Sequence, residues 1–129
     1  MKSENYEYPV VSSSNERKRV CLTLDLKNDP ELIGKYKYYH ARENNWPEIN
    51  EGIMAAGILL MDIYLVENRM FMICEIDANE DFDKCWQKIS TYPKQDEWFK
   101  LMSNFIQALP GKDIEWIKME RVFELPERG

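Results

Sequence analysis

Residues 58–76, ILLMDIYLVENRMFMICEI, decide the fold, because two apolar runs are joined there by a short polar segment. The first run, residues 58–65, predicts a β-strand, and residues 71–76 predict its antiparallel partner. Asn68 lies between the runs and is typical of a tight turn. The stretch therefore predicts a β-hairpin.

A strand and two helices are expected before the hairpin. Residues 20–26 alternate polar and apolar side chains, which predicts a strand with its leucines facing a core. Asp29 is a good N-cap and Pro30 a good first helical residue, so a helix should run from there to about His40. A second helix should run over about 47–57.

The part after the hairpin predicts two more helices and a strand. Apolar residues at helical spacing predict one helix over 81–91 and another that begins after Pro93 and continues through Ile106. A last strand is expected over about 114–125. The order strand, helix, strand, strand, helix, strand is the split β-α-β of a ferredoxin-like α+β fold.

One face of the predicted sheet is too apolar to remain in water. Met61, Phe71, Trp116 and Met119 are expected on the face that the helices leave open. Two such sheets packed face to face would bury these residues, so the sequence predicts a homodimer that closes an α/β barrel.

The chain divides into an N-terminal arm, 1–16, and a single domain, 17–129. The arm carries a serine-rich segment at 12–15. Its apolar residues Tyr6, Tyr8, Val10 and Val11 either dock on a partner subunit or belong to a loose tail.

Composition excludes several classes of protein. The 129 residues carry a net charge of −6, which disfavours a nucleic-acid partner, and the basic triplet 17–19 is expected to be a solvated strand entry. No stretch could span a membrane, since the most apolar one is broken by Gly57 and closed by Asp62. The N-terminus lacks the apolar core of a signal peptide, so we expect a cytoplasmic protein.

The residues that bind metals or phosphates in other proteins are sparse. The three cysteines form no CxxC pair, and His40 is the only imidazole, so a metal site is not expected. There is no glycine-rich phosphate loop. The sequence therefore predicts chemistry without a cofactor.

Three carboxylates lie within apolar strands, at Asp25, Asp62 and Glu75. A buried carboxylate is costly unless it is paired, and Lys118 and Arg121 on the last strand are plausible partners. An internal salt bridge is the favoured interpretation for Asp25. For Glu75 a salt bridge and a role in a site both remain open.

His40 is the natural candidate for acid–base chemistry, because only histidine changes charge near neutral pH without a strong perturbation. Leu32, Tyr36 and His40 are spaced by four residues and share one face of the predicted helix. The alternative is a histidine that caps carbonyl groups at the helix end or simply packs. Lys37 and Tyr38 are expected on the solvated side.

Aromatic residues are predicted to flank His40. Flat aromatic faces complement the C–H faces of a sugar ring, while a few polar groups fix the hydroxyls; the alternative is an ordinary core. The aromatic residues concerned are Tyr36, Trp46, Tyr64, Trp98 and Phe99.

Over about 17–126 the chain resembles the L-rhamnose mutarotase family. The motifs that carry the resemblance, in order, are Tyr36-x-x-x-His40, Trp46-Pro47-Glu48, Ile63-Tyr64, Phe71-x-x-x-Glu75-Ile76, Trp98-Phe99-Lys100 with Met102, and Val122-Phe123-x-Leu125-Pro126. Each motif alone is weak, but their order and spacing together are fairly specific.

The resemblance implies roles for particular residues. His40 matches the catalytic proton donor of the family, and Tyr36 matches its substrate-binding tyrosine. Phe99 stands where a second tryptophan is usual, and Met61 where the enterobacterial pattern has a substrate-contacting tyrosine. The loop between His40 and Trp46 is two positions longer than in that pattern. The binding residues expected together are Trp46, Met61, Tyr64, Glu75, Trp98 and Phe99.

The implied activity is the interconversion of the α and β anomers of L-rhamnose, by acid–base opening and closing of the ring and without a cofactor. L-Fucose, another 6-deoxyhexose, is the competing substrate. A cofactor-independent oxygenase and a non-catalytic sugar-binding or regulatory module of the same architecture remain as alternatives, because fold does not fix function.

Overall fold

The computed structural model describes residues 6–10 and 16–125, and its centre is the predicted hairpin. Strand β3 (Ile58–Val66) and strand β4 (Arg69–Asp77) pair antiparallel, with Tyr64 opposite Phe71. A bulge between Ile58 and Leu60 interrupts the register near the start of β3.

Strand β2 (Arg17–Leu26) pairs antiparallel with the other edge of β4, which gives the strand order β1-β2-β4-β3. Three short strands share the free edge of β2: β1 (Tyr8–Val10), β6 (Ile117–Lys118) and β5 (Ile106–Gln107). They pair with its beginning, middle and end.

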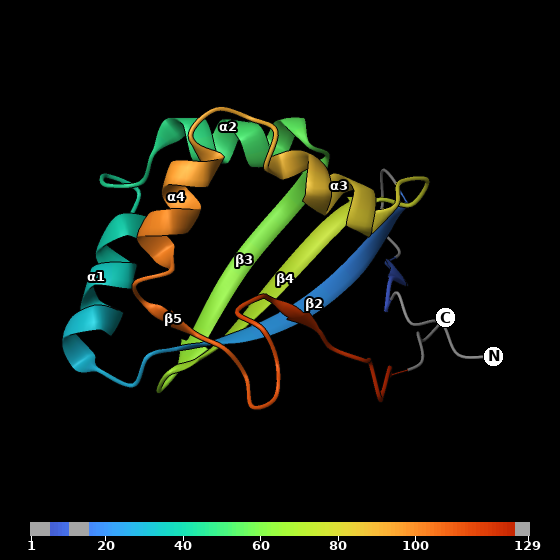
Figure 1. Cartoon of the computed structure of the whole chain (residues 1–129). Coiled ribbons are helices and arrows are strands. Elements are labelled where there is room, and N and C mark those ends of the chain that lie inside the picture. The colour runs from blue at the N-terminus through green and yellow to red at the C-terminus, as the bar shows by residue number, and fades with distance from the viewer. Residues whose placement is uncertain (1–5, 11–15, 126–129) are drawn as a thin grey trace.

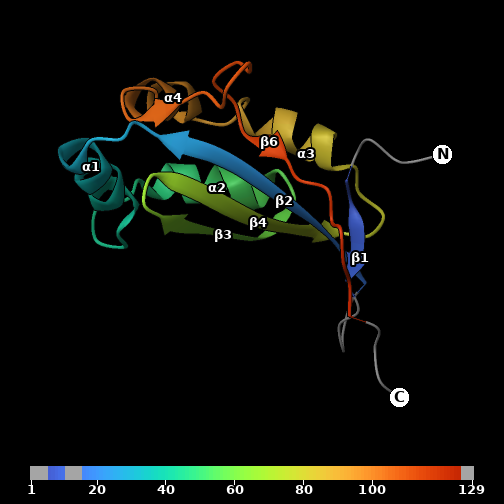
Figure 2. The same ribbon diagram turned by 90° about the horizontal axis from the view of Figure 1, so that it is seen from below.

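The described residues form four helices, and those helices cover one face of the sheet (Figures 1 and 2). They are α1 (Pro30–His40), α2 (Pro47–Ala55), α3 (Phe82–Ile89) and α4 (Gln95–Met102). The Asp29 carboxylate accepts from the backbone N–H groups of Glu31 and Leu32 and so caps α1, as its sequence predicts. Within the part of the chain that the structure describes, no helix is long and apolar enough to cross a bilayer.

The core lies between this helical layer and the sheet, in two clusters. The first contains Val20, Leu22, Ile58, Met72, Cys74, Ile76, Phe82 and Cys85. The second contains Leu24, Leu26, Tyr36, Met70, Met102, Phe105 and Ile106. Ile63 and Trp116 pack against both clusters and so join them.

The expectation that Met61 and Trp116 lie on the open sheet face is wrong. Both pack against the core on the helical side. The bulge near Leu59 adds one residue to β3, and one extra residue reverses the side to which every later side chain points. Ile58 and Met61 therefore both face the helices.

The face without helices is nevertheless apolar. Side chains alternate between the two faces along each strand, so the residues of β2, β3 and β4 that lie between core residues point to this face. Several of them are apolar and only half-buried or exposed. These are Cys21, Leu60, Tyr64, Val66, Phe71 and Ile73. We call this set the open sheet face.

The last predicted strand is also shorter than expected. Only Ile117–Lys118 pair with β2, and one further backbone bond joins Met119 to Cys21. Continuing the ladder would require the edge of β2 near Arg19, which Tyr8 of β1 occupies. The chain instead passes beside β1 (Figure 2), where the Arg121 backbone N–H donates to the Tyr8 hydroxyl at 3.0 Å.

Residues 8–10 of the predicted arm thus belong to the sheet of their own chain. Val11 and the serine-rich segment lie outside the described residues. The predicted helix through Ile106 ends at Met102, because the chain turns at 103–105 to pair Ile106 with Leu26. These differences leave the predicted α+β, ferredoxin-like class intact.

Candidate active site

The last turn of α1 brings Tyr36 and His40 together, as their spacing predicts. Their rings stack with centroids 4.0 Å apart and planes 24° apart. His40 Nδ1 lies 2.9 Å from the Tyr36 carbonyl oxygen. Since a carbonyl can only accept, Nδ1 carries a proton, and the lone pair of the neutral ring is on Nε2.

Two tryptophans from other segments complete an aromatic cluster. Trp98 of α4 meets the His40 ring edge-on, with centroids 5.3 Å apart. Trp46, the residue before α2, meets Trp98 edge-on at 5.1 Å. The cluster therefore contains four of the predicted site residues: Tyr36, His40, Trp46 and Trp98.

A cavity of about 310 Å³, here called the His40 cavity, lies between α1 and the sheet. Most of its lining is apolar: aliphatic side chains of β3 and β4 form one wall, and Tyr36, Lys37 and His40 of α1 supply polar groups to the other. Its lining residues are Tyr36, Lys37, His40, Ala41, Ile63, Leu65 and Met70. A space of this size, apolar on one side and polar on the other, suits a small ligand such as a monosaccharide.

Burial sets the protonation states of the two α1 residues. It lowers the pKa of His40 below its usual 6.5, against a smaller raising effect of the hydrogen bond to Tyr36. Burial raises the pKa of Tyr36 well above its usual value. At neutral pH the site therefore presents a neutral imidazole that can accept a proton at Nε2, beside a neutral phenol.

Two of the expected binding residues lie on the opposite face of the sheet. Tyr64 belongs to the open sheet face and is 58% exposed. Glu75 is buried on that same face, where it pairs with Arg17 at 3.2 Å and Arg19 at 2.7 Å. The structure therefore does not bring Tyr64 or Glu75 to His40.

Met61 and Phe99 are close to the site in sequence but do not line its cavity. Met61 packs against the first core cluster, while Ile63, two residues later on the same face, lines the cavity. Phe99 follows Trp98 on α4 but is 58% exposed. Neither residue belongs to the aromatic cluster.

The expectation that Lys118 and Arg121 pair with the strand carboxylates is wrong. Lys118 pairs with Asp83 at 2.7 Å and Arg121 with Glu124 at 3.4 Å, so neither serves Glu75. Hydrogen bonds from Arg19 and, more weakly, Arg17 lower the pKa of Glu75 against the opposing effect of burial. The basic triplet is therefore in part an ion-pair partner and not merely solvated.

The internal salt bridge expected for Asp25 is confirmed. The Arg69 guanidinium donates to both carboxylate oxygens, at 2.8 and 3.0 Å. Asp25 thus has a structural partner and is not needed to explain the site.

Sequence patterns missed five residues of the His40 cavity: Lys37, Ala41, Ile63, Leu65 and Met70. Lys37 is exposed as expected, yet it lines the cavity. The strand residues could have been found from pairing, because Leu65 lies opposite Met70 and shares a face with Ile63. Among the described residues, no three His, Cys, Asp or Glu side chains form a group that could hold a metal ion.

Comparisons of the sequence identify the family. The L-rhamnose mutarotase family model matches residues 19–125. A UPF0734 protein of Dictyostelium discoideum is 37% identical, over 87% of this chain and 93% of that protein. An L-fucose mutarotase of Xanthomonas campestris is 32% identical, over 84% and 89%. An L-rhamnose mutarotase of Shigella flexneri is 27% identical, over 70% and 86%.

Comparisons of the structure agree on the fold. The crystal structure of an L-rhamnose mutarotase from Formosa agariphila has a TM-score of 0.57 at 19% identity and covers 84% of this chain and 98% of that one. A dimeric ferredoxin-like protein from an uncultured marine organism has a TM-score of 0.52 at 22% identity, covering 85% and 91%. With the family model matched over nearly the whole domain, the chain is a member of the L-rhamnose mutarotase family and hence an isomerase.

Proposed function

We propose that this protein interconverts the α and β anomers of L-rhamnose by acid–base opening and closing of the sugar ring. The observation that carries the proposal is the pairing of His40 with Tyr36 at the wall of the His40 cavity. The hydrogen bond from Nδ1 to the Tyr36 carbonyl orients the ring and leaves Nε2 available to the substrate.

In this mechanism His40 is the base for opening and the proton donor for closing. Nε2 takes the proton of the anomeric hydroxyl as C1=O1 forms, and the C1–O5 bonding pair goes to the ring oxygen. A water held by the Tyr36 hydroxyl gives that oxygen a proton. Rotation about C1–C2 exposes the other carbonyl face, and closure reverses both proton transfers.

The rate enhancement that one acid–base pair can supply is sufficient for mutarotation. Positioned acid–base catalysis contributes about a hundred- to ten-thousand-fold, or roughly 3–5 kcal/mol of barrier. Mutarotation already proceeds slowly in water, so no stronger device is required. Trp98 and Trp46 do not line the His40 cavity, but Trp98 contacts the His40 ring, so we propose that the sugar extends from the cavity past His40 and lays its C–H face on these indoles.

The aliphatic wall supports a 6-deoxy sugar as the substrate. Ile63, Leu65 and Met70 offer no hydrogen-bonding side chain, so a methyl group at C6 would be matched there and a hydroxymethyl group would lose its hydrogen bonds to water. L-Rhamnose and L-fucose both carry that methyl group and differ in configuration at C2 and C4.

L-Fucose is the second candidate substrate. The Xanthomonas campestris L-fucose mutarotase is more similar to this chain than the Shigella flexneri L-rhamnose mutarotase, at 32% against 27% identity and with greater coverage. Family membership favours an isomerase over the oxygenase and non-catalytic alternatives.

Saturation-transfer NMR tests the proposal, because it measures anomer exchange directly. L-Rhamnose and L-fucose would be examined separately at equal concentration, with an enzyme-free sample to subtract spontaneous exchange. We expect enzyme-dependent exchange, fastest with L-rhamnose. Faster exchange of L-fucose would reassign the substrate, and no enzyme-dependent exchange of either sugar would contradict the proposed function.

We also propose that two copies pack through the open sheet face. Its apolar residues are uncovered in the single chain, and one structural relative is described as dimeric. The partners proposed are thus a monosaccharide and a second copy of this chain, with neither nucleic acid nor membrane.

A further inference from the structure

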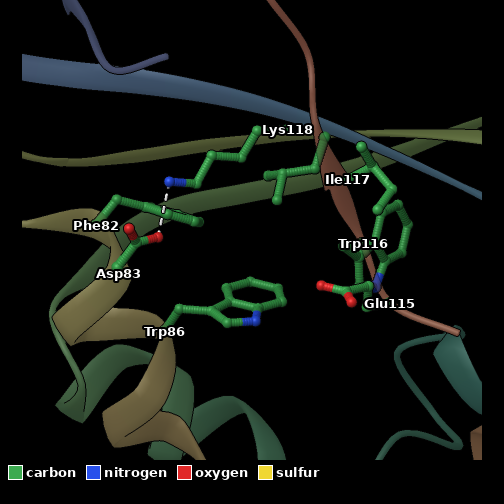
Figure 3. A pocket seen from close by; sticks show the side chains of 8 residues that line it. Phe82, Asp83, Trp86, Glu115, Trp116, Ile117 and Lys118 are labelled. Atoms are coloured by element: carbon green, nitrogen blue, oxygen red, sulfur yellow. Dashed lines mark ion pairs between the residues drawn. The ribbon is translucent and has the colours of Figure 1, made fainter. Parts of the chain in front are cut away.

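A second cavity, of about 230 Å³, lies between α3 and the segment around β6, away from the proposed chemistry (Figure 3). Leu22 of β2 is one of its lining residues. The remaining lining residues are Phe82, Asp83, Trp86, Glu115, Trp116, Ile117 and Lys118. None of the eight also lines the His40 cavity, so the two cavities are separate.

Two indole rings form walls of the second cavity. Figure 3 shows Trp86 along one side and Trp116 along another, with open space between them. The Phe82 ring, which also lines the cavity, stacks on Trp86 with centroids 5.5 Å apart and planes 28° apart, and so helps to hold that indole in place. Both indoles remain partly exposed. They therefore present rigid, partly hydrated apolar surface to any ligand that enters.

Polar groups stand beside these rings. The Lys118 ammonium pairs with the Asp83 carboxylate at 2.7 Å and lies 5.7 Å from the centre of the Phe82 ring. The Glu115 carboxylate extends toward the space between the two indoles (Figure 3) and has no ion-pair partner in the described chain. The cavity thus offers one ammonium donor and two carboxylate acceptors next to flat apolar walls.

This combination fits a pyranose ring better than an organic cation. A pyranose has an apolar C–H face to stack on an indole and hydroxyl groups at its edge that both donate and accept. A cation would gain little here, because Lys118 offsets one carboxylate and Glu115 is exposed, where single ion pairs are weak. We propose that the second cavity is a non-catalytic binding site for a neutral pyranose.

The protein contains four tryptophans, which makes the two cavities separately observable. Trp46 and Trp98 report on the His40 site, and Trp86 and Trp116 report on the second cavity. In protein labelled with nitrogen-15, each indole N–H gives its own NMR signal, which single Trp→Phe variants assign.

The experiment is a titration with methyl α-L-rhamnopyranoside, whose anomeric centre is blocked. We expect the Trp86 and Trp116 signals to shift together with a midpoint on the order of 10 mM, as suits a shallow site. Because the cavities are separate, the same shifts should persist in Trp98→Ala. Unmoved Trp86 and Trp116 signals at about ten times that concentration, or shifts that vanish in Trp98→Ala, would overturn the proposal.

Two variants identify the ligand class. Trp86→Ala should weaken the second-site midpoint by about fivefold or more, because the stacking wall is lost. Glu115→Gln keeps an acceptor oxygen and should leave it within about twofold. A choline salt serves as the cationic probe. If choline moves these signals at lower concentration than the glycoside, and Glu115→Gln abolishes that response, the cavity is a cation site instead.

The second site and the proposed function fail in distinguishable ways. Anomer exchange is followed on free sugars, whereas the second site is followed on the indole signals of Trp86 and Trp116. The wild-type titration decides the proposal even if Trp86→Ala does not fold, because it requires no variant at the cavity itself.

Discussion

The neutral state of His40 follows from where α1 ends. Its ring is stacked on Tyr36, meets the edge of Trp98 and keeps one hydrogen bond, to a backbone carbonyl. Burial disfavours the imidazolium, and among the described residues no carboxylate forms an ion pair with it. A ring held in this way suits reversible proton transfer better than a charged histidine at an exposed helix end would.

Three substitutions should separate proton transfer from binding. His40→Ala should lower the enzyme-dependent anomer exchange rate by about a hundredfold or more, with sugar affinity within a few-fold. Tyr36→Phe removes only a hydroxyl and should cost less, in both rate and affinity. Trp98→Ala should mainly weaken binding, because stacking acts equally on ground and transition states.

Saturation-transfer NMR measures the anomer exchange rate of each variant, and a binding titration measures its affinity for the sugar. Urea unfolding of each variant provides the control for stability. Near-full exchange in His40→Ala, at unchanged stability, would show that the histidine is structural.

The pH profile should follow the neutral form of His40. Its pKa is lowered below 6.5, so exchange should be constant around pH 7 and fall as the pH drops through that lowered value. The lowered pKa also means that the unfolded chain binds the His40 proton more readily than the folded chain does. The contribution of His40 to the free energy of unfolding is therefore fully present above pH 6.5 and is lost as the pH falls through the lowered pKa.

The predicted activity profile is tested by exchange rates measured from about pH 4.5 to 8 and corrected for the enzyme-free reaction. A corrected rate that rises toward acid would contradict it.

At the scale of elements, local patterns predicted what local interactions determine. Alternation in residues 20–26 and the Asp29-Pro30 start gave β2 and α1, because side-chain period and capping are local. The bulge near Leu59 could not be predicted, since its neighbours on both faces are apolar. The short β6 could not be predicted either, because it depends on competition with β1, distant in sequence, for the same edge of β2.

The same reasoning applies to the site. Tyr36 and His40 were predicted together because they are one helical turn apart, whereas the contact of His40 with Trp98 depends on how α1 and α4 pack in the folded chain. Met61 and Tyr64 are three residues apart in one strand and so cannot share a face. This odd spacing alone excludes a site on one face of the sheet that contains both Met61 and Tyr64. The resemblance to the family, which suggested both residues, took no account of the spacing.

Two glycines in helices test the packing of the helical layer. A Cβ at Gly52 of α2 would lie 2.6 Å from Gln95 Nε2 and 2.9 Å from Tyr92 Cβ, so Gly52→Ala should destabilise the fold by about 1–3 kcal/mol. Gly34 of α1 has nothing within 4 Å of that position, so Gly34→Ala should stabilise by up to about 1 kcal/mol. Urea unfolding measures both. Equal effects of the two substitutions would contradict the tight contact of α2 with the start of α4.

At the scale of the whole molecule, the two faces of the sheet differ in what they contact and contain. The helical side contains the core and both cavities. The other side displays apolar residues together with the Arg19–Glu75 and Arg69–Asp25 ion pairs. Charged pairs within an apolar surface restrict which surfaces can pack on it, and a second copy related by a two-fold axis offers the same pattern in reverse.

Dimerisation through the open sheet face should therefore be sensitive to one charge there. Sedimentation at micromolar concentration should give about twice the 15.4 kDa mass of the chain. Ile73→Asp places a carboxylate in the middle of that face, directly opposite Asp62 of β3, so dimerisation would have to bury two like charges together, and the variant should be a monomer. Met54→Asp is the matched control: Met54 is 63% exposed on α2, on the helical side, and its replacement should leave the mass unchanged. A wild-type monomer that binds no hydrophobic dye, or a dimer that survives Ile73→Asp, would exclude packing through this face.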